Sequence, residues 1–392
     1  MATTHQNQPG WLSVNDCSVS ELDLVVQQRA DIADYPYATS IEREIVVYDA
    51  GELRRALAAG QRRAVLAELA QALSVGPGIV AFTGAIASGI VTPATAVFEE
   101  LIAEQHRTGT ARGDHFAKPG ANDRVWNALE KLAVQAPDVF VDYYASDMLA
   151  LVSQAWLGPG YQMTSQINIV NPGGQAQSPH RDYHLGFLSD AVAEGYPTHV
   201  HMVSPMLTLQ GAVAHCDMPE ATGPTLYLPH SHKYPSGYLA WRRPDVIDYF
   251  NQHYAQLPLA KGDAVFFNPA VLHAAGTNVT SDIKRMANLL QVSSAFGRAM
   301  ETIDRTRMIE AVYPSLMARR AAGLSNQAVS NAVAAMAEGY AFPTNLDRDP
   351  PLNGLAPASQ ADVVHRALAQ SWTTGQLQNE LAQYSTRRRS HS

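Results

Sequence analysis

Cysteine is scarce in this sequence, with only Cys17 and Cys216 among 392 residues. Two cysteines cannot form a disulfide framework, and their separation excludes a Cys-x-x-Cys site. Such low cysteine usage suits a reducing compartment. The polar N-terminus, residues 1–11, also lacks the apolar core of a signal peptide. We therefore expect a soluble, cytoplasmic protein.

Charged residues make up only 16% of the chain, and 36 Asp and Glu outnumber 28 Lys and Arg. The net charge of −8 gives no sign of binding to nucleic acid or to an anionic membrane. The one basic run, residues 387–389, lies in a polar tail that we expect to be disordered. An uncharged stretch, residues 73–98, is interrupted by proline and glycine and favours a buried strand at 78–82 over a membrane span.

Hydrophobic spacing divides the chain into three parts. Helical periodicity predicts amphipathic helices before and after a central region, at 52–59, 62–73, 94–106, 125–132, 146–155, 299–321, 326–337, 360–369 and 376–384. Between them, short segments separated by Gly and Pro predict strands at 161–170, 206–214, 225–228, 263–268 and 286–293. Strands at this spacing indicate a sandwich or barrel of the jelly-roll or cupin class. We predict an N-terminal segment with amphipathic helices (1–77), a jelly-roll core with flanking helices (78–295) and a helical C-terminal extension with a polar tail (296–392).

Two segments of the central region have a pronounced polar character. Along residues 161–170, the even-numbered Gln162, Thr164, Gln166 and Asn168 share one side, which we expect to face water. Residues 112–124 are polar, contain glycine and show no period. They suit either a solvated loop or a lid that contacts substrate.

The chemistry of the chain centres on His180 and Asp182. We expect the segment around them to form a strand. Residues two apart on a strand point to the same side, so both side chains can reach one metal ion. A second histidine, His273, follows a turn and a predicted strand, and Arg285 opens the next strand. Two histidines and one carboxylate are the ligand set of non-haem Fe(II) oxygenases. The guanidinium of Arg285 matches the planar geometry of a carboxylate.

Three blocks of the sequence, at 180–182, 222–232 and 261–285, resemble the phytanoyl-CoA dioxygenase (PhyH)-like family of Fe(II)/2-oxoglutarate-dependent oxygenases. The resemblance covers roughly residues 78–295 and implies a double-stranded β-helix, a cupin-like jelly roll. It implies that His180, Asp182 and His273 bind Fe(II) and that Arg285 pairs with the distal carboxylate of 2-oxoglutarate. It also places Asn168 and Gln210 among the residues that bind this cosubstrate. O2 is the third reactant.

The sequence departs from the family pattern at a few positions. His230 stands where a Pro-Gly-Ser-His turn usually has glycine, and Ala275 stands where a serine often helps to hold 2-oxoglutarate. Some members carry the arginine one residue earlier, which makes Lys284 an alternative anion ligand. Halogenating relatives replace the carboxylate with Ala or Gly, so Asp182 disfavours halogenation.

The resemblance implies hydroxylation of an unactivated C–H bond in a small-molecule metabolite or biosynthetic intermediate, with release of succinate and CO2. Alternatives are desaturation or another oxidation, an acyl-CoA substrate, a cupin-type metal enzyme that does not use 2-oxoglutarate, and a catalytically silent jelly-roll binding protein. We expect no nucleic-acid or membrane partner, whereas the C-terminal helices can cap the cavity or form a homo-oligomer. His184 shares a side with the metal ligands and can support them. The remaining histidines of the central region are expected in turns or on the surface, namely His199, His201, His215, His230, His232 and His253.

Overall fold

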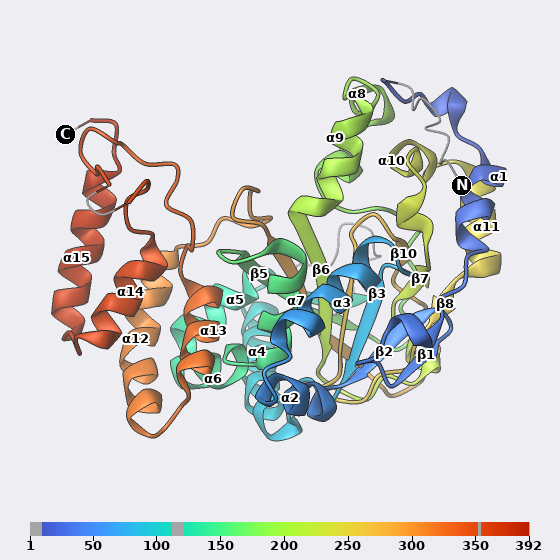
Figure 1. The fold of residues 1–392 in the computed structure, drawn as a ribbon. Coiled ribbons are helices and arrows are strands. Elements are labelled where there is room, and N and C mark those ends of the chain that lie inside the picture. Colours follow the sequence, from blue (N-terminus) through green and yellow to red (C-terminus); the bar gives the residue numbers. More distant parts are fainter. Residues whose placement is uncertain (1–9, 112–120, 352–353, 392) are drawn as a thin grey trace.

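The computed structural model describes residues 10–111, 121–351 and 354–391. Figure 1 shows two β-sheets at the centre of the molecule, helices packed beside them, and a separate group of C-terminal helices at one end. The arrangement confirms the predicted jelly-roll core, which helical segments precede and follow along the chain. The lid interpretation of residues 112–124 falls mainly on residues 112–120, which lie outside the described residues.

The larger sheet has eight strands and is antiparallel except for one parallel pair. In spatial order they are β1 (Ser40–Glu42), β2 (Ile45–Asp49), β3 (Ile79–Thr83), β9 (Ala264–Phe267), β6 (Thr208–Ala214), β11 (Arg285–Ser293), β5 (Gln162–Val170) and β4 (Asn122–Val125). The smaller sheet contains β10 (Leu272–Ala274), β7 (Leu226–Leu228) and β8 (Ala255–Gln256). Side chains of both sheets meet in one buried cluster, where the rings of Tyr227 and Phe267 lie 5.1 Å apart. The sheets therefore face each other and enclose an interior.

Helices cover the outer face of the larger sheet. They are α2 (Ala50–Ala58), α3 (Arg62–Ser74), α4 (Ser88–Arg107), α5 (Ala128–Gln135), α6 (Pro137–Tyr144) and α7 (Asp147–Leu157). Alternation along β5 sends Met163, Ile167 and Ile169 into the core against these helices. The polar side of β5 faces the interior, where Thr164 and Gln166 are buried. The expectation that this polar side faces water was wrong, because the second sheet covers it.

The C-terminal part consists of α12 (Arg305–Ala321), α13 (Asn326–Met336), α14 (Gln360–Ala369) and α15 (Thr374–Arg387). Its helix periods were predicted correctly, and α12 packs on α5 and α6. The expected disordered tail was wrong in part, because Arg387 ends α15 and forms ion pairs with Asp349 and Glu380 at 3.2 and 3.1 Å. Arg388 stacks over the Tyr384 ring.

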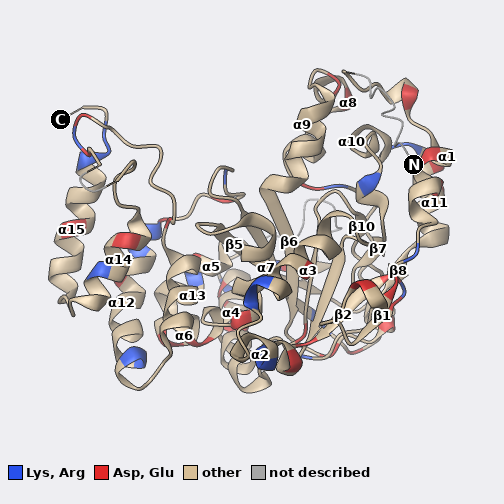
Figure 2. Ribbon diagram, viewed as in Figure 1, with Lys and Arg blue, Asp and Glu red and all other residues tan. Residues whose placement is uncertain are grey.

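The remaining helices lie beside the smaller sheet: α1 (Val19–Val26), α8 (Asp190–Ala193), α9 (Thr198–Val203), α10 (Gly237–Ala240) and α11 (Pro244–His253). In the part of the chain that the structure describes, no helix is both long and apolar enough to cross a bilayer. Figure 2 shows acidic and basic positions interspersed along the chain.

Candidate active site

A cavity of about 440 Å³ lies between the two sheets. It is lined by Arg124, Trp126, Gln166, Asn168, Gln177, His180, Asp182, Phe187, Gln210, Gly211, Ala212, Pro224, Thr225, Phe267, His273, Ala275, Arg285, Ala287, Leu289, Leu290, Gln291 and Met300. Every residue assigned to the site from the sequence is in this set.

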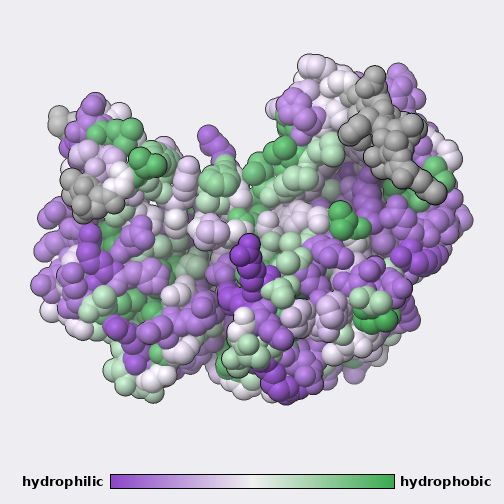
Figure 3. Space-filling view, in the orientation of Figure 1, coloured by the Kyte–Doolittle hydropathy of each residue, from purple (hydrophilic) through white to green (hydrophobic). Residues whose placement is uncertain are grey.

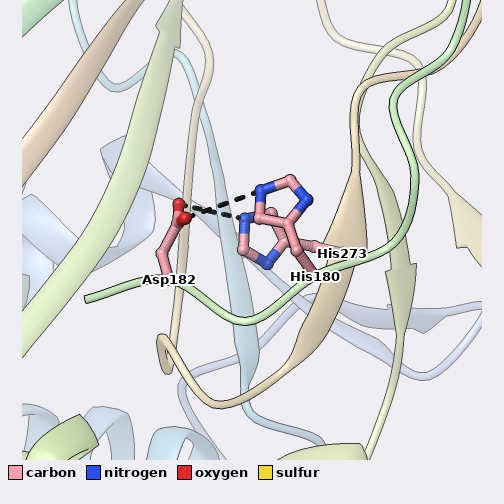
Figure 4. A group of neighbouring side chains, drawn as sticks. All are labelled: His180, Asp182 and His273. Carbon is pink, nitrogen blue, oxygen red and sulfur yellow. Dashed lines mark ion pairs between the residues drawn. The ribbon is translucent and has the colours of Figure 1, made fainter. Parts of the chain in front are cut away.

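His180, Asp182 and His273 converge on one point in the cavity (Figure 4). Nε2 of His180 lies 3.6 Å from Oδ1 of Asp182, and Nε2 of His273 lies 3.5 Å from Oδ2. Among the described residues, these three form the one group of His, Cys, Asp or Glu side chains arranged to hold a metal ion. Figure 4 shows both imidazoles directed toward the Asp182 carboxylate, so the three donor atoms lie close together.

The backbone holds the two histidines together. His180 and His273 form an isolated antiparallel bridge, in which His180 N donates to His273 O at 2.9 Å and His273 N donates to His180 O at 3.1 Å. His273 lies on β10, but neither His180 nor Asp182 lies on a strand. The predicted strand through residue 180 was therefore wrong, since only one residue of that segment pairs with the sheet.

Hydrogen bonds to the backbone fix the orientation of both imidazoles. Nδ1 of His180 lies 2.9 Å from the carbonyl oxygen of Ser178, and Nδ1 of His273 lies 3.0 Å from that of Val271. A carbonyl oxygen only accepts, so each Nδ1 carries the proton in the neutral ring and Nε2 keeps its lone pair. Metal-binding histidines are usually oriented in this way.

Asp182 is held in its ionised form. Burial raises the pKa of its carboxyl, but the neighbouring His180 and His273 and the hydrogen bond from Nε2 of Gln210 to Oδ2 outweigh burial. Its pKa therefore lies well below the ordinary range. The site thus presents an anionic oxygen and two imidazole nitrogens, a donor set that fits a divalent transition metal.

Arg181, between two of these residues, points away from them into the protein. It is 2% exposed and donates from Nη2 to the carbonyl oxygens of Ser231 and Tyr234. Its guanidinium also lies over the Tyr238 ring. Sequence reasoning missed this role. Arg181 fastens the segment that carries two of the three donor atoms.

Arg285 begins β11 and is 6% exposed, and it lines the cavity. Its Nη1 has no hydrogen-bond partner in the structure, and burial lowers the pKa of the guanidinium to about 10. Burial of a cation with an unpaired donor costs free energy, and a bound anion would offset that cost. The alternative, Lys284, is exposed and does not line the cavity.

Asn168 and Gln210 both line the cavity and are both buried. Oδ1 of Asn168 and Oε1 of Gln210 have no hydrogen-bond partner in the structure. Gln210 contacts Asp182 directly through its other amide atom. These unpaired atoms are available to a bound molecule.

Other histidines of the central region form hydrogen bonds within the protein and lie away from the metal site. His184 is exposed and hydrogen-bonded to Ser204. His201 and His215 are buried, so the expectation of turn or surface positions was wrong for these two, whereas His230 is buried within a turn, as expected. His230 adopts a φ of 66°, the left-handed conformation that glycine favours. Its ring contacts Glu44 and Lys233. The turn thus keeps a glycine-like backbone with a histidine in place.

Comparison with known proteins gives one family match. The sequence profile of phytanoyl-CoA dioxygenase (PhyH) matches residues 50–286. No curated protein matches the chain.

Similar solved structures include the non-haem α-ketoglutarate-dependent epimerase SnoN from nogalamycin biosynthesis, with 18% identity, a TM-score of 0.41, and coverage of 59% of this chain and 82% of that one. The carbocyclase SnoK from the same biosynthesis has 20% identity and a TM-score of 0.40 over 56% of this chain and 80% of that one. AviO1 from Streptomyces viridochromogenes Tue57 has 18% identity and a TM-score of 0.41 over 57% and 93%.

Proposed function

The chain belongs to the phytanoyl-CoA dioxygenase family, and on that premise we propose that His180, Asp182 and His273 bind Fe(II) and that Arg285 binds the distal carboxylate of 2-oxoglutarate. As a member of this family, the protein is a non-haem Fe(II)- and 2-oxoglutarate-dependent dioxygenase. Bound Fe(II) supplies the oxidation, in which substrate R–H, O2 and 2-oxoglutarate give R–OH, succinate and CO2.

The observation that carries the proposal is the pairing of two features in one cavity. One carboxylate oxygen and two imidazole nitrogens lie close together, and the buried guanidinium of Arg285, which pairs with no carboxylate among the described residues, lies in the same cavity. Three protein ligands would leave positions open on a bound Fe(II) for the keto acid and for O2. A catalytically silent binding protein has no requirement for this complete set. A cupin-type enzyme without a keto acid has no requirement for Arg285.

We assign a second hydrogen-bond donor at the carboxylate end of the cavity to Thr225. Tyr227 and His273 are register partners on β7 and β10, as are Leu226 and Ala274, so the next residues outward are Thr225 and Ala275. Both line the cavity. Thr225 therefore lies next to Ala275, the position at which the family often has a serine. The Thr225 hydroxyl can donate to the anion that Arg285 binds. Asn168, with its unpaired Oδ1, lies on β5 opposite Ala287 and completes the proposed cosubstrate site.

We propose a small-molecule substrate, hydroxylated at an unactivated C–H bond. The cavity has the size of a site for one small molecule beside the cosubstrate. Its lining contains no lysine, and Arg124 and Arg285 are its cations among the described residues. Such a lining gives little support for the phosphates of coenzyme A. A metabolite or biosynthetic intermediate therefore fits better than an acyl-CoA.

We further propose a cytoplasmic location, which the two free cysteines suit. We also propose residues 78–295 as the oxygenase core, 1–77 as an N-terminal segment with amphipathic helices that adds β1 and β2 to the larger sheet, and 296–392 as a helical C-terminal extension. The C-terminal helices are our candidate surface for a homo-oligomer, which a measurement of molecular mass in solution tests.

A screen of candidate substrates for stimulated succinate release tests the function. Purified protein with Fe(II), 2-oxoglutarate and O2 should release succinate slowly alone and faster with a substrate. The His180→Ala variant provides the blank. Succinate release that is equal in the two proteins for every compound contradicts the proposal.

A further inference from the structure

The end of the cavity remote from Arg285 carries two facing glutamines. Gln210 on β6 and Gln291 on β11 are direct register partners, and both line the cavity. Arg285 and Gln291 lie near opposite ends of β11, separated by roughly 20 Å of extended strand. Gln210 contacts Asp182. The two amides therefore lie beside the metal ligands, on the side away from the proposed carboxylate anchor.

The orientation of the Gln210 amide is fixed by Asp182. An ionised carboxylate only accepts hydrogen bonds, so the amide nitrogen of Gln210 must face Asp182. Its oxygen, Oε1, is then left as an acceptor. Gln210 is 9% exposed, and Oε1 has no partner in the structure. A buried carbonyl oxygen in this state favours a ligand that donates a hydrogen bond.

The orientation of the Gln291 amide is fixed by a chain of hydrogen bonds that starts at Arg124. Arg124 is a donor only, and its Nη1 lies 2.7 Å from Oε1 of Gln166. Nε2 of Gln166 therefore donates to Oε1 of Gln291, at 3.2 Å. This chain of hydrogen bonds leaves Nε2 of Gln291 as a donor beside the cavity. The glutamine pair thus offers one acceptor and one donor.

The remaining walls at this end are apolar. Trp126, Phe187, Leu289 and Met300 line the cavity, and Phe187 is 54% exposed. The segment that carries Phe187 is joined to the one after α9 by the hydrogen bond between His184 and Ser204. Figure 3 shows hydrophobic residues along α9, beside the hollow that separates it from the C-terminal helices. Asp182 is the one carboxylate among the described lining residues.

We propose that Gln210 and Gln291 form a substrate subsite for an uncharged group that both donates and accepts a hydrogen bond, a hydroxyl or a carboxamide attached to an apolar body. This inference rests on the proposed function, because it assigns the second molecule in the same cavity. It gives Gln210 a role toward the substrate, in place of the cosubstrate role that the family resemblance implies. A carboxylate does not fit, since it has no donor for Oε1 of Gln210 and repels Asp182. Because Gln210 contacts a metal ligand, the oxidised carbon lies close to the recognised group.

Binding of small aromatic probes tests the subsite without turnover. The full chain is loaded anaerobically with Fe(II) and 2-oxoglutarate, and saturation-transfer NMR measures binding of benzamide, N,N-dimethylbenzamide and benzoate. Benzamide has the donor and the acceptor, its dimethyl analogue has lost the donor, and benzoate carries the charge. One hydrogen bond corresponds to roughly a two- to tenfold change in affinity. We expect benzamide to bind at least about fivefold more tightly than either analogue.

Two variants and one control locate the effect. Gln291→Leu should remove the preference for benzamide. Gln291→Glu replaces the amide donor with an anionic acceptor, so this variant should instead prefer the cation benzamidine. Gln252→Leu, on the exposed face of α11, is the matched control and should keep the wild-type preference. Retained preference in Gln291→Leu, or equal affinity of wild type for the three probes, overturns the inference. The metal-to-keto-acid absorption band in the same samples reports the proposed function separately.

Discussion

Replacing Arg285 with methionine should have opposite effects on ligand binding and on the stability of the unliganded protein. Burial lowers the pKa of this guanidinium from 12.5 to about 10, which corresponds to roughly 3 kcal/mol against the charged form. Methionine keeps much of the side-chain length without the charge, so the metal-free protein should become more stable by up to about 3 kcal/mol. Loss of a buried charge pair with 2-oxoglutarate should weaken its binding by about 2–5 kcal/mol, at least roughly 30-fold in Kd.

Two measurements on the same preparations test this pair of effects. Thermal unfolding of metal-free protein gives the stability change, and anaerobic titration of the Fe(II) protein with 2-oxoglutarate gives Kd. The exposed neighbour Lys284 supplies the control, since Lys284→Met should alter neither quantity. A Kd for Arg285→Met within threefold of the wild-type value would refute the assignment of the anchor. So would a loss of binding in Lys284→Met.

Three further predictions concern the cosubstrate hydroxyl, a buried histidine and the support of the metal ligands. Thr225→Val should raise the Kd of 2-oxoglutarate about tenfold, and adding Ala275→Ser should restore part of the affinity; no change in the anaerobic titration contradicts the role of Thr225. Burial lowers the pKa of His215 to about 3, so the unfolded chain takes up a proton below about pH 6.5 that the folded protein excludes. The stabilisation that neutral His215 contributes is therefore fully present above that pH and is lost as the pH falls. In urea unfolding, His215→Asn should reduce the change of the free energy of unfolding with pH by up to about 1.4 kcal/mol per pH unit. An unchanged pH dependence contradicts the assignment. Gly237→Ala would place a methyl group against the guanidinium of Arg181 and should lower Fe(II) affinity roughly tenfold or more in a metal titration. Gly89→Ala, with open space around it, should leave Fe(II) affinity unchanged.

Periodic features of the sequence predicted most of the secondary structure, because burial of one face leaves a regular pattern. The helix α6 was missed, since Phe140, Val141, Tyr143 and Tyr144 are all buried and leave little amphipathic contrast. The polar side of β5 was misplaced because an enclosed cavity and a water-exposed face have the same alternation. The strands before residue 50 depend on pairing with β3, which no local pattern reveals.

The residues of the candidate site were predictable from the sequence, whereas the contacts that support them were not. His180, Asp182, His273 and Arg285 were found from residue type and order, and the structure brings them to one cavity. Their support was not predictable, because it comes from segments distant in sequence. Arg181 bonds to carbonyls of residues 231 and 234, and Gln291 depends on a chain of hydrogen bonds that starts at Arg124. Such contacts are specified by the tertiary fold alone.

The central claim is that His180, Asp182 and His273 hold Fe(II) together with 2-oxoglutarate. The most direct measurement is the visible absorption of the full chain after anaerobic addition of Fe(II) and 2-oxoglutarate. We predict a weak metal-to-keto-acid charge-transfer band that needs both additions, is absent in His180→Ala and decays with formation of succinate when O2 is admitted. Absence of the band in the wild-type protein, or its persistence in His180→Ala, would contradict the claim.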